Sequence, residues 1–295
     1  MMGHGMAKSI LASGFPLTLS IFRRREPVAD LLAAGAVEAP SFAAVASASD
    51  VVYICVTGAA EVESVLLSEH GVLAGARAGL VVVDTSTSEP AVTARLRIAC
   101  AARGVTLVDA PLARTPVEAE QGRLNVMVGA EPAVFERLLP LFKGVWAENV
   151  VLVGGPGAGH TVKLLNNMLA MSQCTAAAEA FAVAARAGVD PRKLVDVVTL
   201  GGVNSGLFQG MAKTLHGDMT GLKFQLDNAR KDIRYYTHLA ESVNVPCSHG
   251  DVVLSNLAMA SAIGFGDAFV PALVAAQEKI NGVKIVGGAA AAAPK

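Results

Sequence analysis

A lysine and an asparagine stand four residues apart in GGPGAGHTVKLLNN, residues 154–167. In a helix, that separation places Lys163 and Asn167 on one face. An ammonium group there could give a proton to a carbonyl oxygen, and the amide could hold a substrate hydroxyl or carboxylate. Two adjacent asparagines are costly inside an apolar helix unless they have partners. This cost favours a functional role over a lysine that merely extends to solvent at a helix start.

An arginine and a threonine follow the stretch VTLVDAP, residues 105–111, which has the composition of a buried strand. Ligands of open α/β sheets bind at the carboxyl ends of the strands. Arg114 offers a fork of N–H donors to an anion, with Thr115 beside it. The sequence therefore predicts a binding site for a small anionic substrate here, and the alternative is a surface arginine in a loop.

Two features near the start indicate a dinucleotide. Met2-Gly3-His4-Gly5 resembles the trailing part of a glycine-rich phosphate turn, although these glycines could equally be leader residues. In SIFRRRE, Arg23 and Arg24 stand where arginines accommodate the 2′-phosphate of NADP. We predict NADP, with NAD as the alternative cofactor; a solvated basic turn would explain the arginines without any cofactor.

Composition excludes several classes of protein. The net charge of −1 gives no electrostatic basis for binding nucleic acid or an anionic membrane surface. The four cysteines are scattered and no Cys/His cluster has zinc spacing, so we expect no metal site and a reducing, cytoplasmic location. The start lacks the features of a signal peptide. The apolar stretch 162–185 carries several polar residues, so we expect no membrane span.

The elements that must position these residues change in type along the chain. In the first half, runs rich in β-branched residues alternate with helical segments, which predicts parallel strands and an open doubly wound sheet. The predicted strands are 17–22, 50–56, 80–86, 105–111, 123–130 and 149–154, and the predicted helices are 6–14, 26–36, 59–68, 89–103 and 131–142.

Residues 160–187 contain no Gly or Pro and would form about 42 Å of helix. The remaining segments read as helical: 191–200, 205–215, 224–243, 248–263 and 267–281. We therefore predict a dinucleotide-binding domain over 1–157, an all-helical domain over 158–285 and a flexible tail over 286–295.

In combination, four motifs make the sequence resemble the β-hydroxyacid dehydrogenase family, which includes 3-hydroxyisobutyrate dehydrogenase. They are VVVDTST (81–87), DAP (109–111), GGPGAGHTVKLLNN (154–167) and RKDIRYY (230–236). The resemblance implies an α/β fold: a doubly wound Rossmann domain followed by an all-α domain joined by a long helix, assembled as homodimers or homotetramers. It also implies roles for individual residues: Lys163 as catalytic acid/base, Asn167 as a substrate ligand, Val56, Thr57, Glu61 and Thr87 along the nicotinamide–ribose path, and Lys231 reaching the cofactor.

Three stretches depart from the family pattern. FRRR replaces the usual end of the second strand, and Val56-Thr57 replaces a leucine–proline. In the substrate loop, Leu112-Ala113-Arg114-Thr115 replaces Val-Ser-Gly-Gly, and sulfolactaldehyde reductases carry a similar Gly-Arg-Thr. The expected substrate is a short 3-hydroxy acid or semialdehyde with a strong anion, either a sulfonate or a carboxylate with extra hydroxyls such as threonate.

Compared with the family, the first strand is apparently missing. Strands 17–22 and 50–56 would flank it, about 9.6 Å apart at two strand spacings. They would either pair directly or keep unpaired backbone groups, each costing roughly 1–3 kcal/mol. We expect a start encoded further upstream, or else a protein with poor cofactor affinity. The rival hypothesis is an impaired oligomerisation or interaction module of the same fold; an imine reductase relative fits less well, because that branch usually replaces the lysine.

Overall fold

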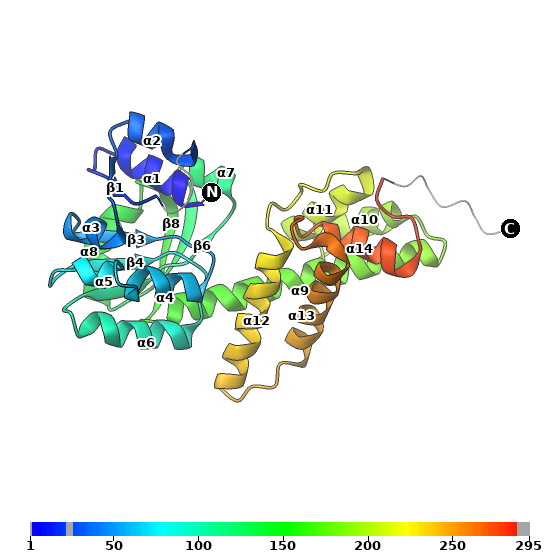
Figure 1. Ribbon diagram of the computed structural model, residues 1–295. Helices are drawn as coiled ribbons and strands as arrows, with labels where there is room; N and C mark the ends of the chain where they lie inside the picture. The colour runs from blue at the N-terminus through cyan, green and yellow to red at the C-terminus, as the bar shows by residue number, and fades with distance from the viewer. Residues whose placement is uncertain (1, 22–25, 288–295) are drawn as a thin grey trace. The chain divides into compact units, whose positions relative to one another are not determined.

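The computed structural model describes residues 2–21 and 26–287. The chain divides into two compact units, Met1–Leu164 and Leu165–Lys295 (Figure 1). The division falls inside one helix, seven residues beyond the boundary that the sequence suggests. The predicted tail overlaps residues 288–295, which lie outside the described residues, as do Arg23 and Arg24.

A six-stranded sheet forms the centre of the first unit. The strand order is β3-β4-β5-β7-β6, and β8 also pairs with β7. The strands are β3 (Val51–Ile54), β4 (Val81–Asp84), β5 (Thr106–Asp109), β6 (Leu112–Ala113), β7 (Leu124–Gly129) and β8 (Ala147–Gly154). β3, β4 and β5 are parallel, and every residue of β4 is buried. The runs of apolar β-branched residues therefore form the buried strands that their composition predicts.

The expectation of parallel pairing fails at one strand. β7 runs antiparallel to β5, whereas β8 is parallel to β7. The segment after β5 forms β6 and the five-residue helix α7 (Pro116–Glu120) instead of a long crossover helix, so the chain returns in the opposite direction. α8 (Pro132–Phe142) then supplies a crossover between β7 and β8, and parallel pairing resumes.

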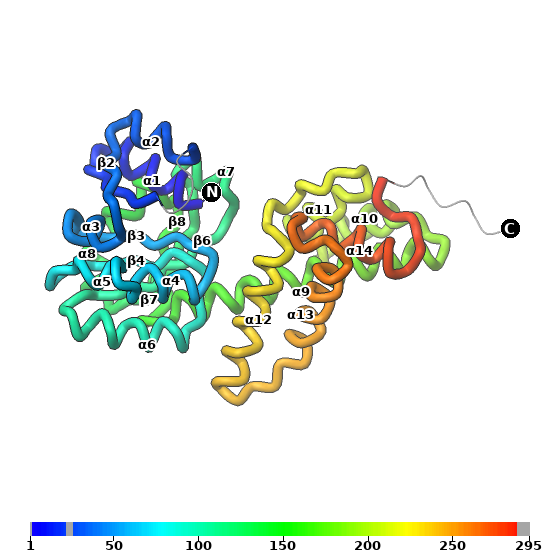
Figure 2. The backbone as a smooth tube through the Cα atoms, viewed as in Figure 1, coloured from blue at the N-terminus to red at the C-terminus, as the bar shows by residue number. Residues whose placement is uncertain are grey.

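A second, two-stranded sheet lies apart from the first. β1 (Thr18–Leu19) and β2 (Val37–Glu38) pair in parallel with each other. No described strand joins them to β3, which is an end strand of the six-stranded sheet. Figure 2 traces the backbone of the first unit from β2 to β3. Of the two arrangements considered for the predicted strands 17–22 and 50–56, the structure has the one in which they do not pair.

The other helices of the first unit follow the predicted segments, with additions. They are α1 (Met2–Ala12), η1 (Glu26–Val28), α2 (Ala29–Ala33), α3 (Phe42–Ser47), α4 (Ala59–Leu67), α5 (Val72–Gly75) and α6 (Pro90–Ala101). α1 packs against α7 so closely that a Cβ on Gly5 would lie 2.4 Å from the backbone of Ala119. Gly5 is therefore required for packing between two helices.

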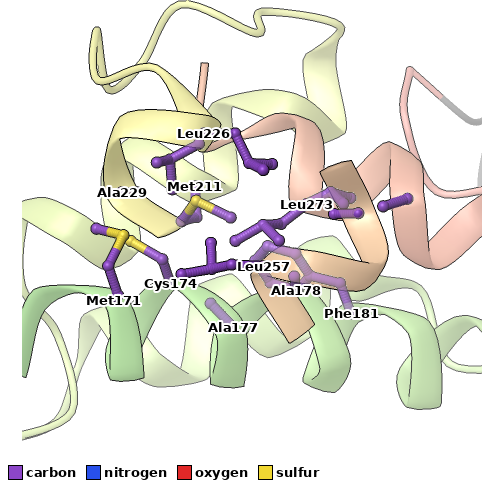
Figure 3. Close-up of a cluster of buried hydrophobic side chains, with 14 of the residues drawn as sticks. Met171, Cys174, Ala177, Ala178, Phe181, Met211, Leu226, Ala229, Leu257 and Leu273 are labelled. Atoms are coloured by element: carbon purple, nitrogen blue, oxygen red, sulfur yellow. The ribbon is translucent and has the colours of Figure 1, made fainter. Parts of the chain in front are cut away.

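The second unit is entirely helical among its described residues. Its elements are the later part of α9 (Ala158–Arg186), α10 (Pro191–Thr199), α11 (Gly206–Ala212), η2 (Lys213–His216), α12 (Leu226–Ser242), α13 (Ser248–Ala260), η3 (Ser261–Phe265) and α14 (Ala272–Asn281). Met171, Cys174, Ala178 and Phe181 recur every three or four residues along α9 and are buried together (Figure 3). Their face packs against α11–α14.

Two predicted helices differ from the expected ones, one in helix type and one in its starting residue. The segment 248–263 ends as α13 at Ala260 and continues as the π-turn η3, inside which Gly264 has φ +104°. The segment 267–281 becomes helical only at Ala272. A left-handed residue interrupts a right-handed helix, and only glycine adopts that conformation without strain, which accounts for the break between these helices.

α9 is the one described helix that is long and apolar enough to cross a bilayer by length and composition alone. Its most apolar window has a mean hydropathy of 1.3, and 44% of that window is buried inside the structure. The central helix of a packed helical domain has the same two properties, and α9 supplies the core residues shown in Figure 3.

Candidate functional site

Polar side chains collect at the carboxyl ends of three parallel strands in the first unit. Ile54, Asp84 and Asp109 end β3, β4 and β5 and are register partners across the sheet. The Oδ1 atom of Asp84 accepts the N–H of Ser86, and Ser86 Oγ accepts the N–H of Val56 at 3.0 Å. These bonds fix the turns that follow β3 and β4 at the edge where ligands of α/β sheets bind.

Asp109 attaches the start of α9 to this edge. Its Oδ1 accepts the N–H of Gly157 at 2.7 Å, and its Oδ2 accepts the N–H of His160 at 3.0 Å. The carboxylate, at the end of β5, thus caps the start of α9. Unsatisfied N–H groups and the helix dipole favour negative charge at that end of a helix. Because Lys163 lies one turn further on, this cap sets the position of its backbone.

Two glycines leave room for that carboxylate. A Cβ on Gly129 would lie 2.5 Å from Asp109 Oδ2, and one on Gly159 would lie 2.8 Å from the same atom. A Cβ on Gly159 would also lie 2.6 Å from the carbonyl oxygen of Met127. The glycines of the motif 154–167 therefore include one that serves the Asp109 cap rather than a ligand.

His160 is fully buried beside this cap. Its Nδ1 lies 2.7 Å from Thr93 Oγ1, and its Nε2 lies 3.6 Å from Asp84 Oδ2. The Thr93 hydroxyl also lies within hydrogen-bond distance of the carbonyl oxygen of Glu89, so Thr93 links the His160 ring to the start of α6. Burial raises the pKa of Asp84 above its ordinary value, and the nearby His160 opposes that rise.

Lys163 and Asn167 both lie on α9, which is continuous over this stretch. Lys163 is half-buried and belongs to the first unit, whereas Asn167 is buried and belongs to the second. Their separation of four helical residues is the one that the sequence indicates.

Within the second unit, Asn167 has a buried partner. Its Nδ2 donates to Asp232 Oδ2 at 2.6 Å, and its Oδ1 accepts a hydrogen bond from the exposed Asn166. The ammonium group of Lys231 lies 2.7 Å from Asp232 Oδ1 and 4.8 Å from the centre of the Tyr235 ring. The buried carboxylate of Asp232 therefore joins two predicted site residues, Asn167 and Lys231.

The two predicted anion ligands of the first unit have protein partners. Arg114 has φ +82°, and its guanidinium donates to the carbonyl oxygen of Arg123 and pairs with Glu148. Thr115 caps α7 and forms a capping box with Glu118. Hydrogen bonds from the two arginines hold the pKa of Glu148 below its usual range.

The residues predicted along the cofactor path lie at the same edge of the first unit. Met2 and Gly3 form the first turn of α1, and a Cβ on Gly3 would lie 3.3 Å from that of Cys55. Val56 and Thr57 follow β3, and Glu61 lies in the first turn of α4. Thr87, which follows β4, is half-buried. The amino end of an eleven-residue helix beside strand ends suits the phosphates of a dinucleotide, so Met2 and Gly3 fit that group.

The sequence interpretation missed three residues of these networks. Asp109 enters the sequence analysis only within the motif DAP, and His160 only within the motif 154–167. Asp232 lies in the quoted motif RKDIRYY, but only its lysine was assigned a role. The available signal was a charged side chain next to an apolar run, which rarely stays buried without partners. Among the described residues, no group of three or more His, Cys, Asp or Glu side chains could hold a metal.

Two family profiles together cover most of the chain. Residues 1–155 match the NAD binding domain of 6-phosphogluconate dehydrogenase, and residues 157–276 match the family described as NAD-binding of NADP-dependent 3-hydroxyisobutyrate dehydrogenase.

Similar proteins match over nearly their whole lengths. The chain is 31% identical to 2-(hydroxymethyl)glutarate dehydrogenase of Eubacterium barkeri, covering 97% of this chain and 95% of that one. It is 33% identical to L-threonate dehydrogenase of Escherichia coli O6:H1, with coverage of 90% and 88%. A crystal structure of 3-hydroxyisobutyrate dehydrogenase from Salmonella typhimurium has a TM-score of 0.80, 33% identity and coverage of 93% and 95%.

Proposed function

Because the chain belongs to the β-hydroxyacid dehydrogenase family of NAD(P)-dependent oxidoreductases, we propose that Lys163 is the acid/base of its reaction. The reaction interconverts a short anionic 3-hydroxy acid, or a hydroxy-sulfonate, and the corresponding semialdehyde. The anchoring of α9 by Asp109 is the observation that carries this assignment, since it fixes a half-buried lysine one turn beyond the ligand-binding edge of the sheet.

Lys163 moves a proton in either direction of the reaction. During reduction its ammonium group gives a proton to the carbonyl oxygen, and during oxidation the neutral amine removes one from the hydroxyl. A nicotinamide, when bound, supplies or accepts the hydride. Met2, Gly3, Val56, Thr57, Glu61 and Thr87 would hold the cofactor, and Lys231 is assigned to the same cofactor. We assign NADP as the preferred cofactor and NAD as the alternative.

The substrate class follows from the donors near the site. The amide of Asn167 can bind a hydroxyl or carboxylate, and its orientation is set by Asp232. In the first unit, Arg114 and Thr115 are proposed to bind the distal anion. Glu148 pairs with Arg114 in this structure, so an anionic substrate would compete with that carboxylate for the guanidinium fork.

The rival hypothesis of a non-catalytic interaction module is not favoured. Relatives that match over 90% or more of this chain are named dehydrogenases, and Lys163 is present at the position the motif requires. Assembly as a homodimer or homotetramer, and a cytoplasmic location, remain proposals. Exposed apolar residues on α9 and α10, among them Leu169, Val183 and Val197, support assembly through the second unit.

The assay that tests the proposed function follows NADPH and NADH oxidation with a panel of short aldehydes. The panel includes methylmalonate semialdehyde, tartronate semialdehyde and sulfolactaldehyde, each matched by an uncharged aldehyde of the same length. We expect turnover only with anionic members and a higher kcat/KM with NADPH. Equal activity on the uncharged aldehydes would contradict the anion site, and no turnover with any member would contradict the proposed reaction.

A further inference from the structure

The side chain of His160 connects the start of α9 to two other elements of the first unit. Its Nδ1 lies 2.7 Å from Thr93 Oγ1 on α6, and its Nε2 lies 3.6 Å from Asp84 Oδ2 at the end of β4. The backbone N–H of the same residue donates to Asp109 Oδ2 at the end of β5. His160 therefore joins the first turn of α9 to two strand ends and to one helix.

The imidazole of His160 is costly to bury unless its polar nitrogens are compensated. His160 is 0% exposed, and among the described residues its Nε2 has no hydrogen-bond partner, although the Asp84 carboxylate lies close to it. An apolar side chain would fill the same volume without the desolvation cost of a polar group. The role of this residue therefore depends on its nitrogens rather than on the volume of its ring.

Two buried carboxylates make a basic ring favourable at this place. Asp84 and Asp109 are register partners at neighbouring strand ends, and both are buried. Burial raises the pKa of the Asp84 carboxyl; the nearby His160 opposes that rise, and the charge of Asp109 adds to it. The imidazole therefore lowers the cost of an ionised Asp84 beside a second carboxylate.

Asp84, His160 and Thr93 have the residue types and the order of a nucleophilic triad, but burial excludes that chemistry. The hydroxyl of a triad must reach the substrate. Thr93 is 2% exposed, and its hydroxyl also lies 3.1 Å from the carbonyl oxygen of Glu89. The three residues form a closed polar chain from β4 through α9 to α6, so their role is to hold these elements together.

We propose that His160 is a positioning residue for Lys163. The two residues are three apart on α9, so they are neighbours on one face of the helix, about 4.5 Å apart along its axis. By holding that face between Thr93 and Asp84, the ring nitrogens fix the direction in which Lys163 leaves the helix. This role rests on the proposed function, because it takes Lys163 as the acid/base. It is separable from the anchor at Asp109, which binds the backbone N–H that variants of His160 retain.

The first test compares two substitutions of His160. His160→Phe keeps a planar ring without nitrogens, whereas the amide of His160→Asn can take the place of Nδ1 and bond Thr93. With the best anionic aldehyde, we expect kcat to fall about tenfold or more in His160→Phe, while KM and NADPH affinity stay within about threefold. His160→Asn should recover most of that loss. The control is Thr161→Val, which removes a hydroxyl that bonds Gly157 within α9 and should leave kcat within about twofold of the native value.

Thr93→Val provides a second variant in which the sequence of α9 is unchanged. It removes the partner of His160 Nδ1, so we expect kcat to fall about threefold or more. Combined with His160→Phe it should cause no further fall, because both substitutions remove the same contact. A native kcat in Thr93→Val, counted per NADPH-binding site, or additive losses in the double variant would overturn the role of His160.

Amide hydrogen exchange separates this role from the proposed function. The amides of residues 161–163 follow His160 in α9, and in Thr93→Val they should exchange about tenfold faster, while those of α8 stay unchanged. If the native chain turns over no aldehyde, the proposed function fails, and this measurement still reports whether the His160–Thr93 contact holds the start of α9. Unchanged exchange at residues 161–163 would show that the contact holds nothing and would overturn the inference.

Discussion

The carboxylate of Asp109, at the end of β5, accepts the backbone N–H of His160 in the first turn of α9 at 3.0 Å. This bond and the one from Gly157 join the sheet edge to the helix that carries Lys163. The position of Lys163, the proposed acid/base, thus depends on Asp109, a residue that need not touch the substrate. Asp109 is therefore a positioning residue. Gly129 and Gly159 leave room for its carboxylate.

The close packing at Gly159 gives a stability prediction. Gly159→Ala should destabilise the protein by roughly 1–3 kcal/mol, the usual cost of overpacking, because its Cβ would meet Met127 O and Asp109 Oδ2. Gly155→Ala is the matched control, since a Cβ there meets nothing within 4 Å. Urea unfolding of both variants measures the difference. Equal midpoints would show that the backbone at residue 159 can move away without cost.

The charge of Asp109 can be tested without changing its shape. Asp109→Asn should cost about 1.5–3 kcal/mol of stability, as expected for hydrogen bonds to a charged group. It should also lower kcat more than it raises KM, because the start of α9 loses its anchor while the substrate donors stay in place. Steady-state kinetics on the folded variant measures the changes in kcat and KM separately. A rise in KM alone would indicate that Asp109 binds substrate directly.

Arg114 provides a test of the anion site. Arg114→Glu should raise KM for anionic substrates at least tenfold, because a repelling charge replaces a donor fork. Arg123→Glu is the control, since Arg123 also lies beside Glu148, 3.4 Å from its Oε2, but has no proposed substrate role. If both variants raise KM equally, the effect reflects the charge of the surface, and the assignment of Arg114 is wrong.

His4 predicts a dependence of stability on pH. Its ring bonds Asp30 of α2 at 3.0 Å and Glu120 of α7 at 2.6 Å, and these bonds raise its pKa above 6.5. Because the folded state binds the proton more tightly, the stabilisation is complete below pH 6.5 and is lost as pH rises through the higher folded value. Thermal melts from pH 6 to 9 should show a larger fall in Tm for the native chain than for His4→Gln. Parallel curves would contradict this role.

Much of the fold could be predicted from the sequence, because buried parallel strands and an uninterrupted helix have strong local patterns. VVYI, VVVD and TLVD became β3, β4 and β5, and the stretch without Gly or Pro became α9. The reversal at β7 could not be predicted in this way. Its direction depends on the short connection through β6 and α7, and a run of apolar residues does not encode the direction of pairing.

The candidate site was predictable in part. Lys163 and Asn167 stood out by spacing, and the unusual Asn–Asn pair indicated a buried partner, which the structure identifies as Asp232. The Asp109 cap and the His160–Thr93 bond join residues 48 to 67 positions apart in the chain. Such pairings arise from tertiary packing, so no local sequence pattern predicts them. The partner that Arg114 finds in Glu148 is non-local for the same reason.

The central claim is that the ammonium group of Lys163 transfers the proton. The most direct test compares Lys163→Met with the native enzyme in single-turnover reduction of the best anionic aldehyde, with NADPH affinity measured separately by fluorescence. The account predicts a loss of 10²–10⁴-fold in the rate of the chemical step, the range for general acid catalysis, and cofactor affinity within about threefold of the native value. Native turnover by Lys163→Met, with NADPH bound, would contradict it.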